Sequence, residues 1–279
     1  MEIGVIGAQS KHTELFCSLI NTSPLFPRMR AVSLWGGDCP ERAGWCMAKG
    51  GLQTLCDRPE EVIERSDGVI ITLRRGETHK ALALACLRAG KPVFVDKPFC
   101  DSVPDAAAMI NLSKQCGTPL TGGSTLCFLP QIAELRERAR HCRSLIISYA
   151  ADCDSPFGGW NFYGSHLADL CSAICGCGAE MVSARRTGRL MDVLVQYPNR
   201  SVLLHSDPTL TEPAVTFHSW DEEYCPLGDF DRCYEYGMRA FRDMMESGVG
   251  QGAQRLLFST RLLDAIGRSL QEARPIPLI

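Results

Sequence analysis

The sequence predicts an α/β protein in which a doubly wound parallel sheet is followed by an α+β domain with a mostly antiparallel, open sheet. Two patterns support this prediction. In the first part of the chain, short apolar stretches alternate with segments of helical spacing, as in parallel sheets covered by helices. From Ser144 onward, alternating stretches are separated by short turns such as Pro198-Asn199, which is typical of antiparallel sheets. We place the boundary at Gly122-Gly123, which gives domains 1–122 and 123–279.

The elements of the first domain follow from local patterns. Strands are expected where apolar residues run together, and helices where apolar residues recur every three to four positions and a cap, proline or glycine marks an end. The expected strands are Ile3–Ile6, Arg30–Trp35, Gly68–Leu73, Pro92–Val95 and Pro119–Thr121. The expected helices are Thr13–Ile20, Pro40–Lys49, Pro59–Arg65, Thr78–Ala89 and a segment that Ser102 caps and that ends at Cys116.

The second domain shows a different rhythm. Its expected strands are Leu145–Ala150, Ala179–Thr187, Arg189–Tyr197, Ser201–Ser206 and Ala214–Ser219. Two helices are expected besides, Gly164–Cys175 and Gln254–Gln271. In the second of these, one face carries Leu256, Leu263, Ile266 and Leu270, as in an amphipathic helix.

Composition limits the classes of function. The 279 residues are 45% hydrophobic, which is enough to fill two cores, and the net charge is −3. Because basic residues are scattered, a nucleic-acid partner is not expected. No apolar run approaches the roughly 20 residues that span a bilayer, so no membrane partner is expected. The first strand begins at once, without a charged and apolar leader, which predicts a soluble cytoplasmic protein.

The fifteen cysteines raise the question of disulfides or a zinc site. No Cys-x-x-Cys occurs, and most cysteines stand singly among apolar neighbours. This pattern favours reduced, buried thiols that behave as small hydrophobic residues. The tightest cluster is Cys171, Cys175 and Cys177; a metal site there stays a minor alternative, because the local sequence supplies no fourth ligand. We therefore predict no metal site.

The strongest functional signal is the stretch Lys91–Phe99, an apolar strand that runs into Asp96-Lys97-Pro98. Open α/β sheets bind ligands at the carboxyl ends of their strands, and the proline restricts the backbone directly after the lysine. Lys97 is therefore the first candidate for a catalytic residue.

These residues resemble a known family, the oxidoreductases of the glucose-fructose oxidoreductase, inositol dehydrogenase and rhizopine-catabolism type (Gfo/Idh/MocA). The resemblance covers nearly the whole chain and is most specific over Asp67–Phe99, where Asp-Gly-Val-Ile-Ile-Thr, Thr78-His79 and the Asp-Lys-Pro triplet follow the family's order. It implies a Rossmann-type dinucleotide-binding domain and a substrate-binding and oligomerisation domain. It also implies that Lys97 lies near the nicotinamide and the substrate.

A second family motif places an aspartate four residues before a histidine. The matching histidine is His166, and Phe162 stands at the aspartate position. A histidine can take the proton of a substrate hydroxyl, and a nearby lysine can polarise the oxygen, so the resemblance implies Lys97 and His166 as the catalytic pair. Asn161 and Tyr163 are candidates to replace the missing carboxylate with a hydrogen bond. The expected substrate-binding residues are Lys97, Asn161, Tyr163 and His166.

The nucleotide loop departs from the fingerprint Gly-x-Gly-x-x-Gly, which lets a pyrophosphate meet bare backbone at a helix start. The aligned residues are Gly7, Gln9 and His12, so only the first glycine is present. Gln9 is expected to direct a side chain toward the phosphates, and His12 to widen the packing of helix against strand.

The ribose end leaves the choice between NAD and NADP open. Asp38, after two glycines, can reach ribose hydroxyls as in enzymes that use NAD, whereas Arg74-Arg75 suits a phosphate, as on NADP. His79 begins a helix and is expected to cap it or pack near the site. The full set of expected cofactor-binding residues is Gly7, Gln9, Ser10, Asp38, Thr72, Arg74, His79, Asp96, Lys97 and Pro98.

Two functions are consistent with these residues. One is hydride transfer between NAD(P) and a hydroxyl or keto group of a sugar, polyol or related small molecule. The other is a catalytically impaired descendant that binds a nucleotide or sugar-like ligand and acts in regulation. The resemblance also implies a homodimer or larger homo-oligomer, formed through the exposed face of the second sheet, where Leu190–Leu204 alternates. The identity of the substrate does not follow from the sequence.

Overall fold

The computed structural model describes residues 1–218 and 222–278. The chain forms two compact units. The first comprises Met1–Cys100, Pro104–Thr125 and Tyr234–Ala253, and the second comprises Asp101–Val103, Leu126–Cys233 and Gln254–Ile279. The chain thus passes from the first unit to the main part of the second between Thr125 and Leu126, a few residues after the expected boundary at Gly122-Gly123. In addition, a later segment returns to the first unit.

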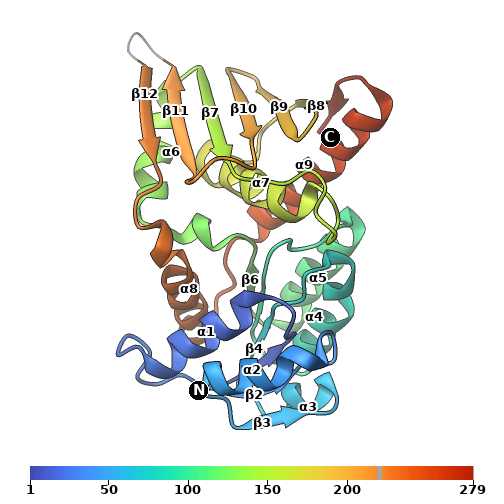
Figure 1. The fold of residues 1–279 in the computed structure, drawn as a ribbon, viewed down its shortest axis with the longest axis vertical. Helices are drawn as coiled ribbons and strands as arrows, with labels where there is room; N and C mark the ends of the chain where they lie inside the picture. Colours follow the sequence, from blue (N-terminus) through green and yellow to red (C-terminus); the bar gives the residue numbers. More distant parts are fainter. Residues whose placement is uncertain (219–221, 279) are drawn as a thin grey trace. The chain divides into compact units, whose positions relative to one another are not determined.

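The first unit is built on a six-stranded parallel sheet with the strand order β3-β2-β1-β4-β5-β6. This is the order of a dinucleotide-binding fold with its switch point between β1 and β4. Figure 1 labels β2, β3, β4 and β6 of this sheet. The strands are β1 (Glu2–Ile6), β2 (Arg30–Trp35), β3 (Thr54–Cys56), β4 (Gly68–Ile71), β5 (Val93–Val95) and β6 (Leu120–Gly122). Their central residues are completely buried, among them Val5, Ile70 and Phe94. The expected doubly wound sheet is confirmed; β3 was not expected.

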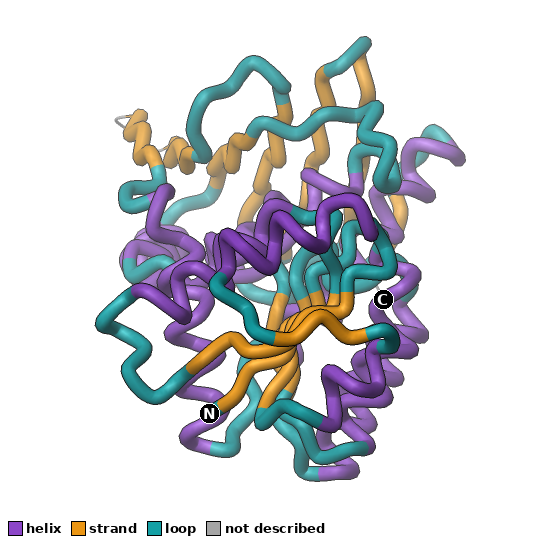
Figure 2. Tube along the Cα trace, turned by 60° about the horizontal axis from the view of Figure 1, so that its bottom comes forward, coloured by secondary structure: helices purple, strands orange, loops and turns teal. Residues whose placement is uncertain are grey.

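Helices cover this sheet on both sides, as the tube in Figure 2 shows. They are α1 (Lys11–Thr22), α2 (Pro40–Gly50), α3 (Pro59–Glu64), α4 (His79–Arg88), α5 (Val103–Cys116) and α8 (Cys233–Ser247), with a 3₁₀ turn η1 (Gly76–Thr78) before α4. Ser10 caps α1, accepting a hydrogen bond from the His12 N–H, and prolines start α2 and α3. Gly51 ends α2 in the left-handed conformation.

Helix α8 was not expected from the sequence, and it lies far along the chain from the sheet that it covers. Phe241 contacts Phe94 of β5, with ring centroids 6.0 Å apart. A Cβ on Gly68 of β4 would meet the Met245 side chain at 2.8 Å. The apolar side of α8 therefore closes the core of the first unit.

The second unit contains a seven-stranded sheet with the order β12-β11-β7-β10-β9-β8-β13. The strands are β7 (Ser144–Tyr149), β8 (Met181–Thr187), β9 (Leu190–Tyr197), β10 (Arg200–Ser206), β11 (Ala214–His218), β12 (Glu222–Pro226) and β13 (Ile276–Pro277). Among the described strands, only β7 and β10 pair in parallel, so the expected, mostly antiparallel sheet is confirmed. Ser219, the expected end of the Ala214–Ser219 strand, lies outside the described residues.

In the described part of this unit the helices are α6 (Gln131–His141), α7 (Asn161–Cys175) and α9 (Ala253–Glu272). Two 3₁₀ turns, η2 (Thr125–Phe128) and η3 (Phe230–Arg232), lie in the connections. Helix α7 is buried along most of its length, and strand β9 buries every second residue on the helix side. The opposite face of the sheet carries half-exposed side chains such as Asp192 and Leu194.

All fifteen cysteines are free thiols, eleven of which are buried. Among the described residues, no three His, Cys, Asp or Glu side chains gather closely enough to hold a metal ion, Cys171, Cys175 and Cys177 included. Likewise, no helix in the described part has the length and apolar character needed to cross a membrane.

Candidate active site

The loop between β1 and α1 has the backbone of a nucleotide-binding loop. Gly7 adopts a φ of +118°, and a Cβ there would lie 3.0 Å from the Leu73 nitrogen and from Oγ1 of Thr72. A side chain would therefore be both strained and crowded at this position. Oγ1 of Thr72 is in turn 3.1 Å from the Gly7 carbonyl, to which it donates, and 2.7 Å from Oγ1 of Thr13. Thr72 thus holds the loop in place by its hydrogen bond to Gly7.

Asp38 binds this loop directly. Its Oδ1 accepts a hydrogen bond from the Ala8 N–H at 2.7 Å, and its Oδ2 accepts one from the Gln9 N–H at 3.1 Å. The sequence placed Asp38 at the ribose; the structure places its carboxylate on the backbone amides instead. The expectation for Gln9 concerned its side chain, but it is the backbone N–H of Gln9 that donates to Asp38.

Lys97 lies where the sequence places it, directly after β5 at the carboxyl edge of the sheet. It is 5% exposed, and Asp96 beside it is 1% exposed. Burial lowers the pKa of Lys97 to about 8; the Asp96 charge opposes this shift and the Arg74 charge adds to it. Arg74 is therefore an electrostatic neighbour of the lysine. A lysine with such a pKa exchanges its proton near neutral pH.

His12, at the position of the third fingerprint glycine, pairs with the buried Asp96. Its Nδ1 lies 2.6 Å from Oδ2 of Asp96, and its Nε2 lies 3.2 Å from the hydroxyl of Tyr234 on α8. Burial raises the pKa of Asp96, but the charge and hydrogen bond of His12, together with the Lys97 charge, outweigh it, so this pKa lies below its usual range. The sequence predicted only that His12 would widen the packing of helix against strand; its pairing with Asp96 and with Tyr234 of α8 was not anticipated.

His79 and Pro98 line the same part of the first unit as buried residues. The His79 ring is fully buried; its Nε2 lies 2.9 Å from the Leu73 carbonyl and its Nδ1 lies 3.2 Å from the Phe99 carbonyl. Both ring nitrogens thus face backbone oxygens and hold together the loops that follow β4 and β5. These contacts fit the expected packing role.

The second unit holds the other candidate residues on α7. His166 is 7% exposed, and its ring centroid lies 4.8 Å from that of Tyr149, at the end of β7. Burial, followed by the Cys233 and Tyr163 charges, raises the pKa of Tyr149 above its usual value, so its hydroxyl keeps its proton. Tyr149 is a neighbour of His166 that the sequence did not indicate. His166 belongs to the second unit and Lys97 to the first.

The residues before His166 form an aromatic group. Phe162 is 5% exposed, and its ring lies 5.2 Å from Phe157 and 4.7 Å from Tyr163, measured between centroids. Tyr163 is 36% exposed and Asn161 is half-buried. The position that matches the family's aspartate is therefore an apolar packing position in this chain.

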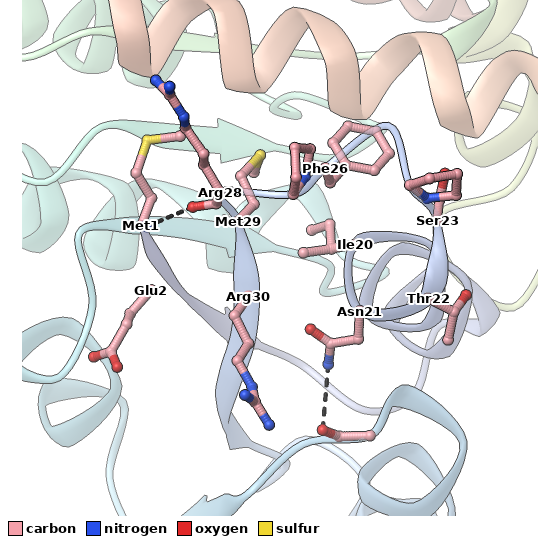
Figure 3. Close-up of a pocket in the computed structure, with 13 residues that line it drawn as sticks. Met1, Glu2, Ile20, Asn21, Thr22, Ser23, Phe26, Arg28, Met29 and Arg30 are labelled. Carbon is pink, nitrogen blue, oxygen red and sulfur yellow. Dashed lines mark hydrogen bonds between the residues drawn. The ribbon is translucent and has the colours of Figure 1, made fainter.

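A separate hollow of about 720 Å³ lies at the opposite edge of the first sheet, where β1 and β2 begin (Figure 3). The Met1 ammonium donates to the Arg28 carbonyl at 2.6 Å, and Nδ2 of Asn21 donates to the Gly51 carbonyl at 3.2 Å. Ligands of parallel sheets bind at the carboxyl ends of the strands. This hollow is therefore not the candidate nucleotide site.

The β1–α1 loop carries chemical groups that suit the phosphate of a dinucleotide. The Ala8 and Gln9 amides already hold an anion, the carboxylate of Asp38, in the loop directly before Ser10, the N-cap of the twelve-residue α1. Furthermore, Oδ1 of Asp96 is buried and has no hydrogen-bond partner in the described part of the protein, so it can accept one from a ligand. The backbone amides that would bind a phosphate are thus present, although the Asp38 carboxylate occupies them. Oδ1 of Asp96 can accept a hydrogen bond from a neighbouring polar atom of the ligand.

Comparison with known proteins agrees with the fold. Residues 1–123 match the family model described as "Oxidoreductase family, NAD-binding Rossmann fold" (GFO_IDH_MocA). Inositol 2-dehydrogenase 2 of Saccharopolyspora erythraea is 28% identical over 120 residues, which are 43% of this chain and 34% of that protein. The matched part thus spans about a third of the relative's length.

Solved structures resemble the whole chain. A probable dehydrogenase from Thermotoga maritima has a TM-score of 0.81 at 17% identity, covering 100% of this chain and 99% of its own. A scyllo-inositol dehydrogenase from Lactobacillus casei, solved with NAD(H) and scyllo-inositol, has a TM-score of 0.83 at 12% identity with the same coverage. At these identities the structures show the shared fold. Residues 1–123 thus resemble the NAD-binding Rossmann domain of the Gfo/Idh/MocA oxidoreductases, and the whole chain shares the fold of these dehydrogenase structures.

Proposed function

We propose that the chain is an NAD(P)-dependent oxidoreductase that transfers a hydride between the nicotinamide and a hydroxyl or keto group of a sugar, polyol or related small molecule. The observation that carries this proposal is Lys97: it is buried at the carboxyl end of β5, and its pKa is lowered to about 8. The names of the relatives, which include inositol dehydrogenases, support a polyol-like substrate.

In the proposed reaction, Lys97 hydrogen-bonds the substrate oxygen. Its positive charge stabilises the negative charge that develops when the hydroxyl loses its proton, because the buried setting strengthens the interaction. His166 accepts that proton, and Tyr149 holds one side of its ring. The cofactor supplies the hydride acceptor when bound. Asn161 and Tyr163, on the first turn of α7, are the proposed substrate-binding groups that stand in for the missing carboxylate.

The substitution Lys97→Met tests this role against Lys91→Met. Lys91 precedes the same strand, and its Nζ donates to the Ser66 carbonyl at 2.6 Å, at the opposite edge of the sheet. We expect Lys97→Met to lower kcat about 100-fold or more, the usual weight of proton transfer, and Lys91→Met to keep kcat within about threefold. The readout is reduction of NAD or NADP with a panel of polyols and sugars. Full turnover in Lys97→Met would remove the lysine from the mechanism.

His166 is tested in the same assay by His166→Gln, with His141→Gln as the control. The His141 side chain is 80% exposed and pairs only with Glu137 among the described ion-pair partners. We expect His166→Gln to lose turnover and the acid limb of the pH profile, while His141→Gln keeps both. An unchanged pH profile in His166→Gln would exclude histidine as the base.

A second candidate function is a descendant that keeps the fold and binds ligand without hydride transfer. Phe162 at the family's aspartate position and the Asp38 contacts with the loop favour it. It predicts saturable ligand binding but no nicotinamide reduction with any substrate of the panel, in wild type and in Lys97→Met alike. Turnover by the wild type would exclude this candidate.

A further inference from the structure

The two carboxylate oxygens of Asp38 occupy the two backbone donors that follow Gly7. The distances are 2.7 Å from the Ala8 nitrogen to Oδ1 and 3.1 Å from the Gln9 nitrogen to Oδ2. A carboxylate that accepts two N–H bonds at once is a close chemical substitute for one edge of a phosphate. Hydrogen bonds with an ionised acceptor are also about twice as strong as neutral ones.

Two glycines, Gly36 and Gly37, allow the contact of Asp38 with the loop amides. A Cβ on Gly36 would lie 2.7 Å from the Ala43 Cβ and 3.1 Å from the Ala8 Cβ, so only glycine lets the chain after β2 pass this close to the loop. A Cβ on Gly37 would meet the Trp35 ring at 2.4 Å. The close approach of this segment brings Asp38 to the amides.

The loop itself is held in place from the other side. Nε of Arg42 donates to the Ala8 carbonyl at 3.0 Å, and its guanidinium also pairs with Glu14 at 2.8 Å. The Gly7 N–H donates to the Trp35 carbonyl at 2.8 Å. The Ala8 and Gln9 amides are thus fixed in direction, and a phosphate that binds there uses the donors that Asp38 uses now.

We propose that Asp38 is an internal anion that occupies the phosphate subsite of the cofactor loop and must leave it before a dinucleotide binds. The proposal rests on the proposed function and adds a means of regulating the same site. It reverses the usual expectation for this acidic residue. An acidic residue that binds the ribose increases the affinity for the nucleotide. An acidic residue that occupies the phosphate-binding N–H groups decreases the affinity for any phosphate, because two anions cannot share the same two N–H groups.

The test uses inorganic pyrophosphate, which carries no ribose, and compares Asp38→Asn with Asp67→Asn. Asp67 is a matched control: its Oδ2 accepts the Glu2 N–H at 2.7 Å, at the opposite end of β1, and the charge change is the same. We expect Asp38→Asn to bind pyrophosphate at least about tenfold more tightly than wild type, as when a binding-competent state rises from a tenth of the population to most of it. Asp67→Asn should stay within about twofold of wild type.

Amide resonances locate the effect. In ¹⁵N-labelled full-length protein, the Ala8 and Gln9 signals should shift in Asp38→Asn and shift again when pyrophosphate is added. Asp38→Ala, which removes both acceptor oxygens, serves as the second variant and should behave alike. Equal pyrophosphate affinity in wild type and both Asp38 variants would overturn the proposal, as would tighter binding without a shift of these two amides.

The same titration with NADH and NADPH keeps the two proposals apart. If pyrophosphate binds more tightly to Asp38→Asn at the Ala8 and Gln9 amides, the role of Asp38 stands even if no dinucleotide is turned over. If NADH or NADPH binds and is turned over while pyrophosphate affinity is the same in all variants, the proposed function stands and the inference on Asp38 fails.

Discussion

Nδ1 of His12 lies 2.6 Å from Oδ2 of Asp96. The histidine occupies the position of the third glycine of a nucleotide fingerprint, and its ring supplies the partner of a carboxylate that is 1% exposed. Restoring the fingerprint at this position would therefore leave a buried carboxylate without its main hydrogen bond. The departure from the fingerprint and the buried Asp96 belong to one arrangement beside Lys97.

His12→Phe tests the energetic weight of this pair. The loss leaves a buried acceptor unsatisfied, so we expect a decrease of about 2–3 kcal/mol in the free energy of unfolding. His205→Phe is the matched control, because His205 and Asp192 form a pair of nearly the same length, 2.7 Å, with side chains 32% and 46% exposed. We expect it to cost less than about 1 kcal/mol. If urea unfolding shows that both substitutions lower the free energy of unfolding equally, burial does not strengthen the His12–Asp96 pair.

Because the pKa of Lys97 is lowered, we expect the free energy of unfolding to increase at alkaline pH. Its pKa is about 8 in the folded protein and near 10.5 in the unfolded chain, so the unfolded chain binds more protons between these values. The charged form is penalised by burial, and this penalty is relieved as the pH rises from about 8 to 10.5. We expect the unfolding free energy of wild type, relative to Lys97→Met, to increase across this window by up to about 3 kcal/mol. A flat difference would show that the lysine is not buried in its charged form.

Gln9→Gly restores the second fingerprint glycine and separates two explanations of the loop. The Gln9 amide, and not its side chain, is the group bonded to Asp38, at 3.1 Å. We therefore expect Gln9→Gly to change pyrophosphate affinity less than about threefold, well below the effect expected of Asp38→Asn. If Gln9→Gly increases affinity as much as Asp38→Asn does, steric blocking by the side chain and not competition by the carboxylate controls the loop.

The uncovered face of the second sheet is the expected surface of a homodimer or larger oligomer. Leu194 of β9 lies on this face and is 37% exposed, while Leu270 of α9 is also 37% exposed. We expect Leu194→Asp to shift the protein toward monomer in light scattering, because a charge at a buried interface is costly, and Leu270→Asp to leave its mass unchanged. A wild type that is monomeric at all concentrations would contradict the expectation.

Local patterns were sufficient for most elements of the fold. Arg30–Trp35 is a strand in the structure with the expected bounds, and the expected helix Thr13–Ile20 lies within α1. Apolar periodicity and capping residues depend only on neighbours along the chain, so they predict such elements well. The three-residue strand β3 and the polar helix α6 are too short or too weakly patterned for this approach.

Long-range pairing was beyond the sequence. Nothing local indicates that Tyr234 and Phe241 of α8 contact His12 and Phe94 in the first unit. The motif after β5 predicted Lys97 at the carboxyl end of a strand, but its burial and its low pKa depend on the folded chain. The Asp38 contact has one signal in the sequence, the glycine pair before it, but its hydrogen bonds depend on where the loop after β1 lies.

The most direct measurement is a calorimetric titration of the full chain with NADH and NADPH, with the Ala8 and Gln9 amide resonances observed in parallel. We expect saturable, one-to-one binding of at least one of the two dinucleotides, with shifts of both amides as the phosphate replaces the Asp38 carboxylate. Absence of binding of both dinucleotides at millimolar concentration, in wild type and in Asp38→Asn, would contradict the proposal that this chain is a nicotinamide-dependent oxidoreductase.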